Sequence, residues 1–241
     1  PDKLASMNGK TLVLVTVRSY EAICAQLEDL GLNTLYVVCI GRSYHRVEAI
    51  RTPSMPLSAV SAIYLQGKWV MITGSLRGIG RQIALNLAER GANLVLHGRS
   101  EQKAKRFAEE CRGYGIEAVP LGAELSRVEE VDGMLESLDR LVPRVDIVFN
   151  NAGISPPCQT THWEVPPRVY QEVFTVNTIA PIRICNHLLP SMIERGFGRV
   201  VNISSSIQHR PAEMAYACSK AALDKYVFDI APTLAKTGVM I

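Results

Sequence analysis

Tyr216 and Lys220 are the residues of this chain whose types and spacing point most directly to chemistry. They bound the segment Tyr-Ala-Cys-Ser-Lys. Residues four apart on a helix lie on the same face, because one turn takes about 3.6 residues. A nearby ammonium group favours the phenolate form of a tyrosine, so the pair could pass a proton to or from a substrate oxygen. The same spacing often arises by chance, so the pair needs support from the rest of the chain.

A glycine-rich segment far upstream, Thr73-Gly-Ser-Leu-Arg-Gly-Ile-Gly80, is typical of a turn that binds phosphate. Gly74 permits a tight turn, Gly78 lets the backbone approach a pyrophosphate, and Gly80 allows a helix to pack closely on a strand. The N–H groups at the start of the following helix could then bind the anion. Because a similar turn can be a plain connection, this segment alone is also ambiguous.

Strands and helices alternate regularly from residue 67 onward, with apolar runs as strands and apolar residues at helical spacing between them. The expected strands cover 69–73, 92–97, 118–121, 146–150 and 199–204, and a sixth begins at 239–241. The expected helices cover 80–90, 101–114, 128–141, 167–194 with a break near Pro181, and 215–236. This alternation predicts an α/β fold, a Rossmann-type doubly wound parallel sheet with helices on both faces.

Residues 1–66 are a separate feature. Apolar runs at 11–17 and 35–40 predict two strands, with a helix at 19–30 between them, and two prolines make 51–60 an extended linker. We therefore expect a small β-α-β appendage and linker over 1–66 and a larger domain over 67–241 that is incomplete at its C-terminal end. So small a unit buries little surface, so it should pack on the larger domain, on a partner or on missing sequence.

The order of the motifs makes residues 67–241 resemble the short-chain dehydrogenase/reductase family. The glycine-rich turn is followed by Asn150-Asn-Ala-Gly153, by an asparagine in Phe-Thr-Val-Asn-Thr, by a serine and by the Tyr/Lys pair. The resemblance implies an NADP-binding oxidoreductase domain that transfers a hydride between a nicotinamide cofactor and a carbonyl or alcohol substrate. It also implies a catalytic set of Asn177, Ser205, Tyr216 and Lys220.

Each member of this set has a role in the family. Tyr216 would be the general acid in reduction and the base in oxidation, and Ser205 would hydrogen-bond the same substrate oxygen. Lys220 would stabilise the tyrosinate and bind the nicotinamide ribose, and Asn177 would hold a water that links Lys220 to solvent. Ser204 stays a second choice for the serine, because the family gap from serine to tyrosine is commonly longer than the one from Ser205.

The end of the second expected strand, Leu96-His-Gly-Arg-Ser100, favours NADP(H) over NAD(H). Members that prefer NAD usually carry an acidic residue where this chain has Gly98, and that acid would repel a 2′-phosphate. Arg99 and Arg77 instead offer guanidinium groups that can bind a phosphate. The alternative is that both are solvated surface arginines.

Further cofactor contacts follow from the resemblance. Glu124 and Leu125 stand where the family usually has an Asp-Leu or Asp-Val pair beside the adenine, and the longer glutamate departs from that pattern. The full expected set is Gly74, Ser75, Arg77, Gly78, Ile79, Gly80, Arg99, Glu124, Leu125, Asn151, Ala152, Gly153, Tyr216 and Lys220.

Composition narrows the classes of partner. The net charge of +3 is small and the basic residues are dispersed, so nucleic-acid binding is not expected. No apolar stretch reaches the ~18 residues that span a bilayer, and no group of His, Cys, Asp or Glu has metal-ligand spacing. The six cysteines lack a CxxC pair and are expected to be buried thiols. With no secretory signal at the start, these features predict a cytoplasmic protein without membrane or metal partners.

Two hypotheses about function remain. The first is an NADP(H)-dependent oxidoreductase of small carbonyl or alcohol substrates, with polar residues near 208–213 favouring hydroxylated ones. The second is a catalytically weak or inactive nucleotide-binding regulatory protein, because too few residues follow Lys220 for the family's substrate lid and last strand. In the family, helices corresponding to 168–194 and 215–236 pair subunits, so we expect a homodimer or homotetramer.

Overall fold

The computed structural model describes residues 13–15, 35–37, 65–156, 164–205 and 211–241. Two compact units, Pro1–Val60 and Ser61–Ile241, divide the chain. In the first, β1 (Val13–Val15) and β2 (Leu35–Val37) pair in parallel and lie inside the two strands expected there. The helix and linker expected at 19–30 and 51–60 lie outside the described residues, and the domain boundary at 66/67 stays a prediction.

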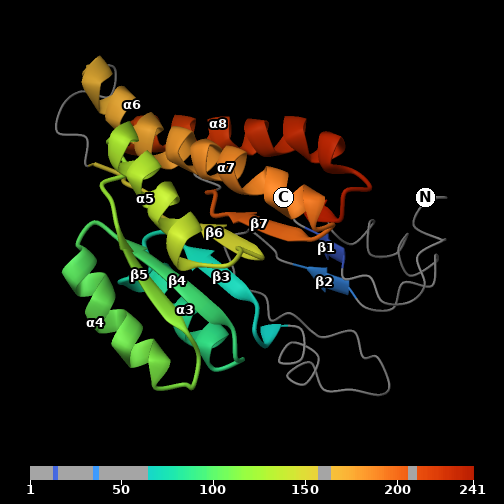
Figure 1. The fold of residues 1–241 in the computed structure, drawn as a ribbon. Helices are drawn as coiled ribbons and strands as arrows, with labels where there is room; N and C mark the ends of the chain where they lie inside the picture. The colour runs from blue at the N-terminus through green and yellow to red at the C-terminus, as the bar shows by residue number, and fades with distance from the viewer. Residues whose placement is uncertain (1–12, 16–34, 38–64, 157–163, 206–210) are drawn as a thin grey trace. The chain divides into compact units, whose positions relative to one another are not determined.

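The second unit is built on a parallel sheet of six strands, in the order β5-β4-β3-β6-β7-β8 (Figure 1). Its strands are β3 (Trp69–Ile72), β4 (Asn93–Gly98), β5 (Ala118–Gly122), β6 (Ile147–Asn150), β7 (Gly198–Asn202) and β8 (Val239–Met240). β3 pairs with β4 on one side and with β6 on the other, so the chain order of the strands runs outward from β3 in both directions. Helices connect the parallel strands, as in doubly wound folds. The predicted doubly wound α/β fold is confirmed.

Helices cover both faces of this sheet (Figure 1). They are α3 (Gly78–Ala88), α4 (Glu101–Arg112), α5 (Val128–Leu141), α6 (Pro167–Phe174), α7 (Ala180–Glu194) and α8 (Met214–Ile230). Alternate residues of each strand enter different cores, since side chains alternate across a strand. Val70 and Ile72 pack with α3 and α4, whereas Trp69 and Met71 pack with α5 and α7.

The helix expected over 167–194 with a break near Pro181 is interrupted directly before that residue, but by a widened turn and not by an end of the helix. Residues Thr175–Ile179 form a π-helical turn between α6 and α7, in which the N–H of Ala180 donates to the carbonyl of Thr175. Pro181 then lies in the first turn of α7. A proline has no N–H and its ring crowds the carbonyl four residues before it, and a widened turn accommodates both effects without ending the helix.

Two other helices differ from expectation at their ends. The α-helix expected at 215–236 ends at Ile230, because Pro232 cannot donate to the carbonyl of Phe228. A 3-10 turn follows over Ala231–Leu234. The helix expected at 80–90 covers Gly78–Ala88, so Gly80 lies inside its first turn.

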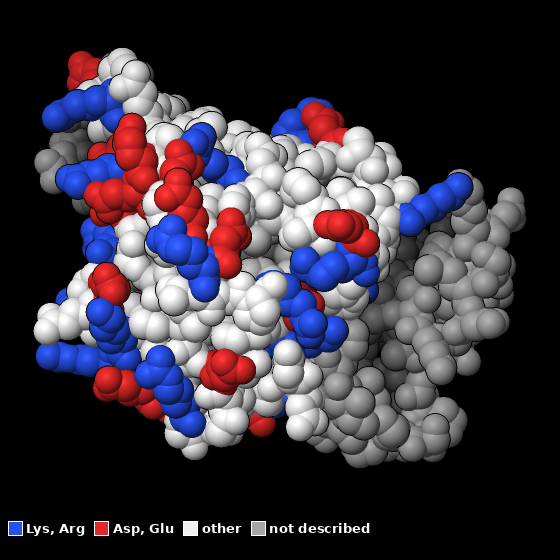
Figure 2. Space-filling model, in the orientation of Figure 1, with Lys and Arg blue, Asp and Glu red and all other residues white. Residues whose placement is uncertain are grey.

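The charges on the surface and the lengths of the helices bear on the classes of partner considered from the sequence. Blue and red side chains are interspersed over the face in Figure 2, without a broad basic field. No helix among the described residues is long and apolar enough to cross a membrane. The described part of the chain also contains no group of three or more His, Cys, Asp or Glu that could hold a metal ion.

Candidate active site

The glycine-rich turn joins β3 to α3 and depends on its glycines for its shape. Gly74 and Gly78 have φ angles of +65° and +55°, in the left-handed region that favours glycine. A Cβ on Gly80 would collide with the carbonyl oxygen of Gly74 and would lie 2.5 Å from Nδ2 of Asn151. The turn therefore folds directly onto the first turn of α3, as the spacing of the glycines predicted.

Hydrogen bonds fasten this turn to the end of β6. Asn151 Nδ2 donates to the carbonyls of Thr73 (2.9 Å) and Gly74 (3.2 Å). In return, Oγ1 of Thr73 accepts from the backbone N–H groups of Asn151 and Ala152, both at 3.0 Å. The Asn-Asn-Ala-Gly segment thus holds the glycine-rich turn in place, at the carboxyl edge of the sheet where doubly wound folds bind ligands.

His97, at the end of β4, is a site residue that the sequence analysis missed. Its ring Nδ1 accepts from the N–H of Gly74 (3.2 Å), and its Nε2 lies 3.0 Å from the carbonyl of Ala123. Its backbone carbonyl accepts from both the N–H and the hydroxyl of Ser75. Burial lowers the pKa of His97. The only signal in the sequence was one histidine in an otherwise apolar buried strand.

The N-terminus of α3 is open to an anion. Its N-cap residue, Arg77, makes no side-chain cap, and the first turn contains no acidic residue. The first N–H groups of a helix have no partner within it, and the helix dipole favours negative charge there. With close-packed glycines beside these donors, the turn fits the pyrophosphate of a dinucleotide.

Arg77 and Arg99 flank this turn and are exposed. Neither guanidinium has an ion-pair partner among the residues that the structure describes. Gly98 packs on Leu76 of the turn so closely that a Cβ there would lie 2.7 Å from its Cγ. An acidic side chain at Gly98 would therefore require Leu76 to move. The charged residues of these two loops are Arg77 and Arg99.

The remaining predicted cofactor contacts differ in their environments. Ser75 is fully buried and bonded to His97, and Leu125 lies in the core beneath α5, so neither offers an exposed side chain. Oε1 of Glu124 accepts from the N–H of Ser126 at 3.3 Å. Ile79 is 64% exposed. Contact of these residues with a cofactor stays a prediction.

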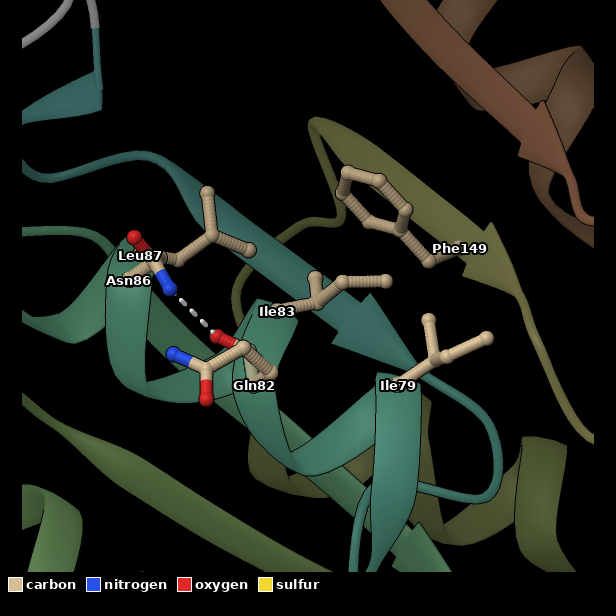
Figure 3. A pocket seen from close by; sticks show the side chains of 6 residues that line it. All are labelled: Ile79, Gln82, Ile83, Asn86, Leu87 and Phe149. Carbon is tan, nitrogen blue, oxygen red and sulfur yellow. Dashed lines mark hydrogen bonds between the residues drawn. The ribbon is translucent and has the colours of Figure 1, made fainter. Parts of the chain in front are cut away.

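Ile79 lines a hollow between α3 and β6 (Figure 3), together with Gln82, Ile83, Asn86, Leu87 and Phe149. The side chains of Ile79, Ile83 and Leu87 extend from α3 toward the side on which Phe149 lies. No titratable residue lines this hollow, so it can bind apolar groups but cannot perform proton transfer.

The structure brings Lys220 and Tyr216 together on α8. Lys220 Nζ lies 5.8 Å from the centroid of the Tyr216 ring and donates to the carbonyl of Ile203 at 2.6 Å. The side chain is buried, and burial lowers the pKa of Lys220, while the charge of Asp224 acts in the opposite direction. Tyr216 itself is half-buried.

Asn177 lies in the π-helical turn and joins the loop after β6 to α8. It is fully buried, and its Oδ1 accepts from the N–H of Ile154 at 2.8 Å. Its Nδ2 donates to the carbonyl of Ile154 (2.9 Å) and to Oγ of Ser219 (3.0 Å). Ser219 in turn donates to the backbone carbonyl of Tyr216. The widened turn thus places Asn177 where it fixes the start of α8.

Gly153 is the point where these elements meet. A Cβ at this position would lie 3.3 Å from Oδ1 of Asn177 and 3.6 Å from Nζ of Lys220. Three of the predicted residues, Gly153, Asn177 and Lys220, are therefore neighbours, although they come from different elements.

Three serines follow β7, and the structure describes two of them, Ser204 and Ser205. Oγ of Ser204 is enclosed and has no hydrogen-bond partner in the described part of the chain. Ser205 is half-buried. Of the polar residues expected to favour a hydroxylated substrate near 208–213, those at 208–210 lie outside the described residues. The choice between the two serines stays a prediction.

Of the three cysteines that the structure describes, one departs from expectation, and Cys24, Cys39 and Cys158 lie outside the described residues. Cys111 and Cys185 are buried, as predicted, and burial raises the pKa of each thiol to about 11. Cys218, between Tyr216 and Lys220, is exposed, so its assignment to the buried thiols was wrong. It lies on the side of α8 that faces solvent, while Ser219 and Lys220 face the core.

Known proteins share this fold and these segments. The family model for short chain dehydrogenases matches residues 68–241. A short chain dehydrogenase of Pseudocercospora fijiensis is 33% identical over 73% of this chain and 58% of its own length. The 3-oxoacyl-(acyl-carrier-protein) reductase FabG of Aquifex aeolicus is 34% identical over 74% of this chain and 73% of its own. The chain thus spans somewhat over half the length of the first relative and about three quarters of the length of the second.

Solved structures agree. A gluconate 5-dehydrogenase of Burkholderia cenocepacia, in complex with NADP and tartrate, has a TM-score of 0.68 and 30% identity, over 75% of this chain and 71% of its own. An NAD+-bound xylitol dehydrogenase has a TM-score of 0.67 and 27% identity, over 73% and 68%. Membership of one family accounts for the fold, the glycine-rich turn and the order of the motifs. The chain belongs to the short chain dehydrogenase family.

Proposed function

We propose that the protein is an NADP(H)-dependent oxidoreductase that interconverts a carbonyl and an alcohol in a small molecule. The observation that carries this proposal is the position of Lys220, buried beside Gly153 with its Nζ 5.8 Å from the Tyr216 ring. When bound, a nicotinamide cofactor supplies or accepts the hydride. The chain's own residues must then bind the cofactor, orient the substrate and move one proton.

Tyr216 is the proton donor in reduction and the acceptor in oxidation. Its half-buried phenol lies on the same helix face as Lys220, whose ammonium stabilises the phenolate that donation leaves behind. The carbonyl of Ile203 fixes the lysine from the other side. These two contacts hold the Lys220 ammonium group beside the Tyr216 ring.

Ser205 is the donor to the substrate oxygen in this proposal. A hydroxyl that donates to an oxygen on which negative charge develops stabilises the transition state. The enclosed Oγ of Ser204 supports Ser205 as this donor, because an enclosed hydroxyl cannot meet a ligand. Asn177 positions α8 through Ser219, and a water between it and Lys220 would link the site to solvent.

NADP(H) is the proposed cofactor rather than NAD(H). Arg77 and Arg99 support it because both are exposed, neither is engaged in an ion pair among the described residues, and Gly98 leaves no acid beside them. The related gluconate 5-dehydrogenase binds NADP, whereas the related xylitol dehydrogenase binds NAD+. The family fold thus admits both cofactors, and the loop residues of this chain favour the phosphorylated one.

The proposed substrates are small polyhydroxylated carbonyls or alcohols. The polar residues expected near 208–213 support this class, as do the tartrate and the names of the two solved relatives. We also propose a homodimer or homotetramer paired through α7 and α8. Phe228 of α8 is 78% exposed and Ile193 of α7 is 41% exposed, and both would leave water on pairing. A cytoplasmic location stays a prediction.

The test is consumption of NADPH by the purified chain across a panel of keto sugars, keto acids and simple ketones. We expect turnover with at least one polyhydroxylated ketone and a lower KM for NADPH than for NADH. Binding of NADPH without turnover of any carbonyl would contradict the proposed activity. Light scattering at micromolar concentration tests the oligomer, and a monomer would contradict that part alone.

A further inference from the structure

We propose that His97 is a positioning residue for the dinucleotide: its ring accepts the N–H of Gly74 and so holds the glycine-rich turn in its binding conformation. This inference rests on the proposed function, because it assigns a residue to the same cofactor site. His97 belongs to β4 and does not itself lie among the anion-binding donors. It acts through the turn.

The hydrogen bonds divide the N–H groups of the turn into two sets. Those of Gly74 and Ser75 both donate to His97, one to the ring at 3.2 Å and one to the backbone carbonyl at 2.9 Å. They are therefore directed at β4 and are not free for an anion. The donors left for a pyrophosphate include those of the first turn of α3, which begins at Gly78.

Only one form of the imidazole makes both ring contacts. Nδ1 must carry no proton to accept from Gly74, and Nε2 must carry one to donate to the carbonyl of Ala123. In imidazolium both nitrogens are donors, so a proton on Nδ1 would face the N–H of Gly74. The turn would then have to move, because a partly buried N–H without an acceptor is costly.

The surroundings of the ring keep it neutral. It is 2% exposed, and burial disfavours the charged form. The charge of Glu124, in the loop after β5, favours protonation of the ring, but burial opposes protonation more strongly. The neighbouring strands β3 and β5 carry no charged residue. His97 lies on the same face of β4 as Val95, which packs with α5 and α7. The acidic, basic and histidine residues of these two helices are Glu129, Glu130, Asp132, Glu136, Asp139, Arg140, Arg183, His187 and Glu194. Arg81 of α3 and the charged residues of α4 belong to the helices on the opposite face of the sheet.

Linkage gives the proposal a measurable consequence. If the dinucleotide binds the turn only when His97 is neutral, then bound dinucleotide must lower the pKa of His97 further. A residue that merely packed beneath the turn would show no such coupling. The negative charge of the pyrophosphate alone would act in the opposite direction and raise the pKa of His97.

Two variants separate the two ring contacts. His97→Asn keeps an acceptor, Oδ1, at the position of Nδ1, but is too short to reach the carbonyl of Ala123. His97→Gln places its amide at the distance of Nε2 and has no acceptor at the position of Nδ1. Asn93→Ala is the control, since it removes a side-chain acceptor of a backbone N–H, that of Glu117, at the opposite end of β4.

The experiment titrates each protein with NADP+ by calorimetry and follows the ring ¹⁵N signals of wild-type histidines with pH, with and without NADP+. We expect His97→Gln to raise Kd by roughly tenfold, with His97→Asn and Asn93→Ala within about threefold of wild type. In the wild-type complex, His97 should be the neutral Nε2–H tautomer, with a lower pKa than in the free protein.

Two outcomes would overturn the inference while the proposed function stands: wild-type Kd in His97→Gln, or a His97 pKa that rises or stays constant on binding NADP+. The ¹⁵N measurement needs no variant to fold, so a misfolded His97→Gln does not protect the inference. If wild-type protein binds neither NADP+ nor NAD+, the proposed function itself is contradicted.

Discussion

Gly80 packs so closely against Gly74 that position 80 has no room for a side chain. A Cβ on Gly80 would collide with the carbonyl oxygen of Gly74 and would approach Nδ2 of Asn151 to 2.5 Å. Both contacts are with groups held in place, one by the backbone and one by hydrogen bonds to Thr73 and Gly74. The glycine-rich turn and α3 therefore form one rigid unit at the edge of the sheet.

Gly80→Ala should destabilise the protein. The added methyl group must displace the turn or Asn151, which costs about 1–3 kcal/mol of unfolding free energy as overpacking does elsewhere. Denaturant unfolding measures this loss. Gly133→Ala is the matched control, because a Cβ there meets nothing within 4 Å in the middle of α5. The control should gain about 0.5–1 kcal/mol, and equal effects of both substitutions would contradict the proposed contact.

Arg99→Ala should change cofactor preference. Loss of a guanidinium that binds the 2′-phosphate should raise the Kd for NADP+ by about tenfold or more and leave the Kd for NAD+ nearly unchanged. Calorimetric titration with both dinucleotides measures the ratio. Arg140→Ala, which removes a charge from α5, should change neither Kd. A parallel loss of NADP+ and NAD+ affinity in Arg99→Ala would argue against a contact with the 2′-phosphate.

Lys220→Met should change the pH dependence of stability and should also abolish turnover. Burial lowers the pKa of Lys220 in the folded state, so above that pKa the unfolded chain binds more protons than the folded one. Wild-type stability should therefore gain a contribution as pH rises from the folded pKa toward the ordinary value of about 10.4. The variant should lack this contribution and lose turnover. Unfolding free energies measured from neutral to alkaline pH test the claim, which fails if both proteins show the same slope.

Much of the site could be predicted from the sequence because its residues follow a fixed order along the chain. Gly74, Gly78 and Gly80 have a spacing that is typical of a phosphate-binding turn, and Asn151 follows a recognisable strand. The sheet followed from regular alternation of apolar strands and amphipathic helices. These features are local, and local patterns can be recognised in a sequence without knowledge of contacts between distant residues.

The misses arise from contacts between distant residues and from hydrogen-bond detail. His97 gave no spacing signal, because its partners, Gly74 and Ala123, lie on either side of it in other segments. The effect of Pro181 depended on whether the preceding turn could widen, which no propensity scale describes. The exposure of Cys218 depended on which face of α8 is covered. Each of these is decided by packing.

The central claim is that Tyr216 moves the proton, and Tyr216→Phe tests it most directly. The substitution removes one oxygen and leaves the ring beside Lys220 in place. Kcat for NADPH-dependent reduction of the best carbonyl substrate should fall by about 10²–10⁴-fold, while the Kd for NADP+ stays within about threefold of wild type. Tyr114→Phe, on an exposed tyrosine after α4, should leave both unchanged. Wild-type kcat in Tyr216→Phe would contradict the account.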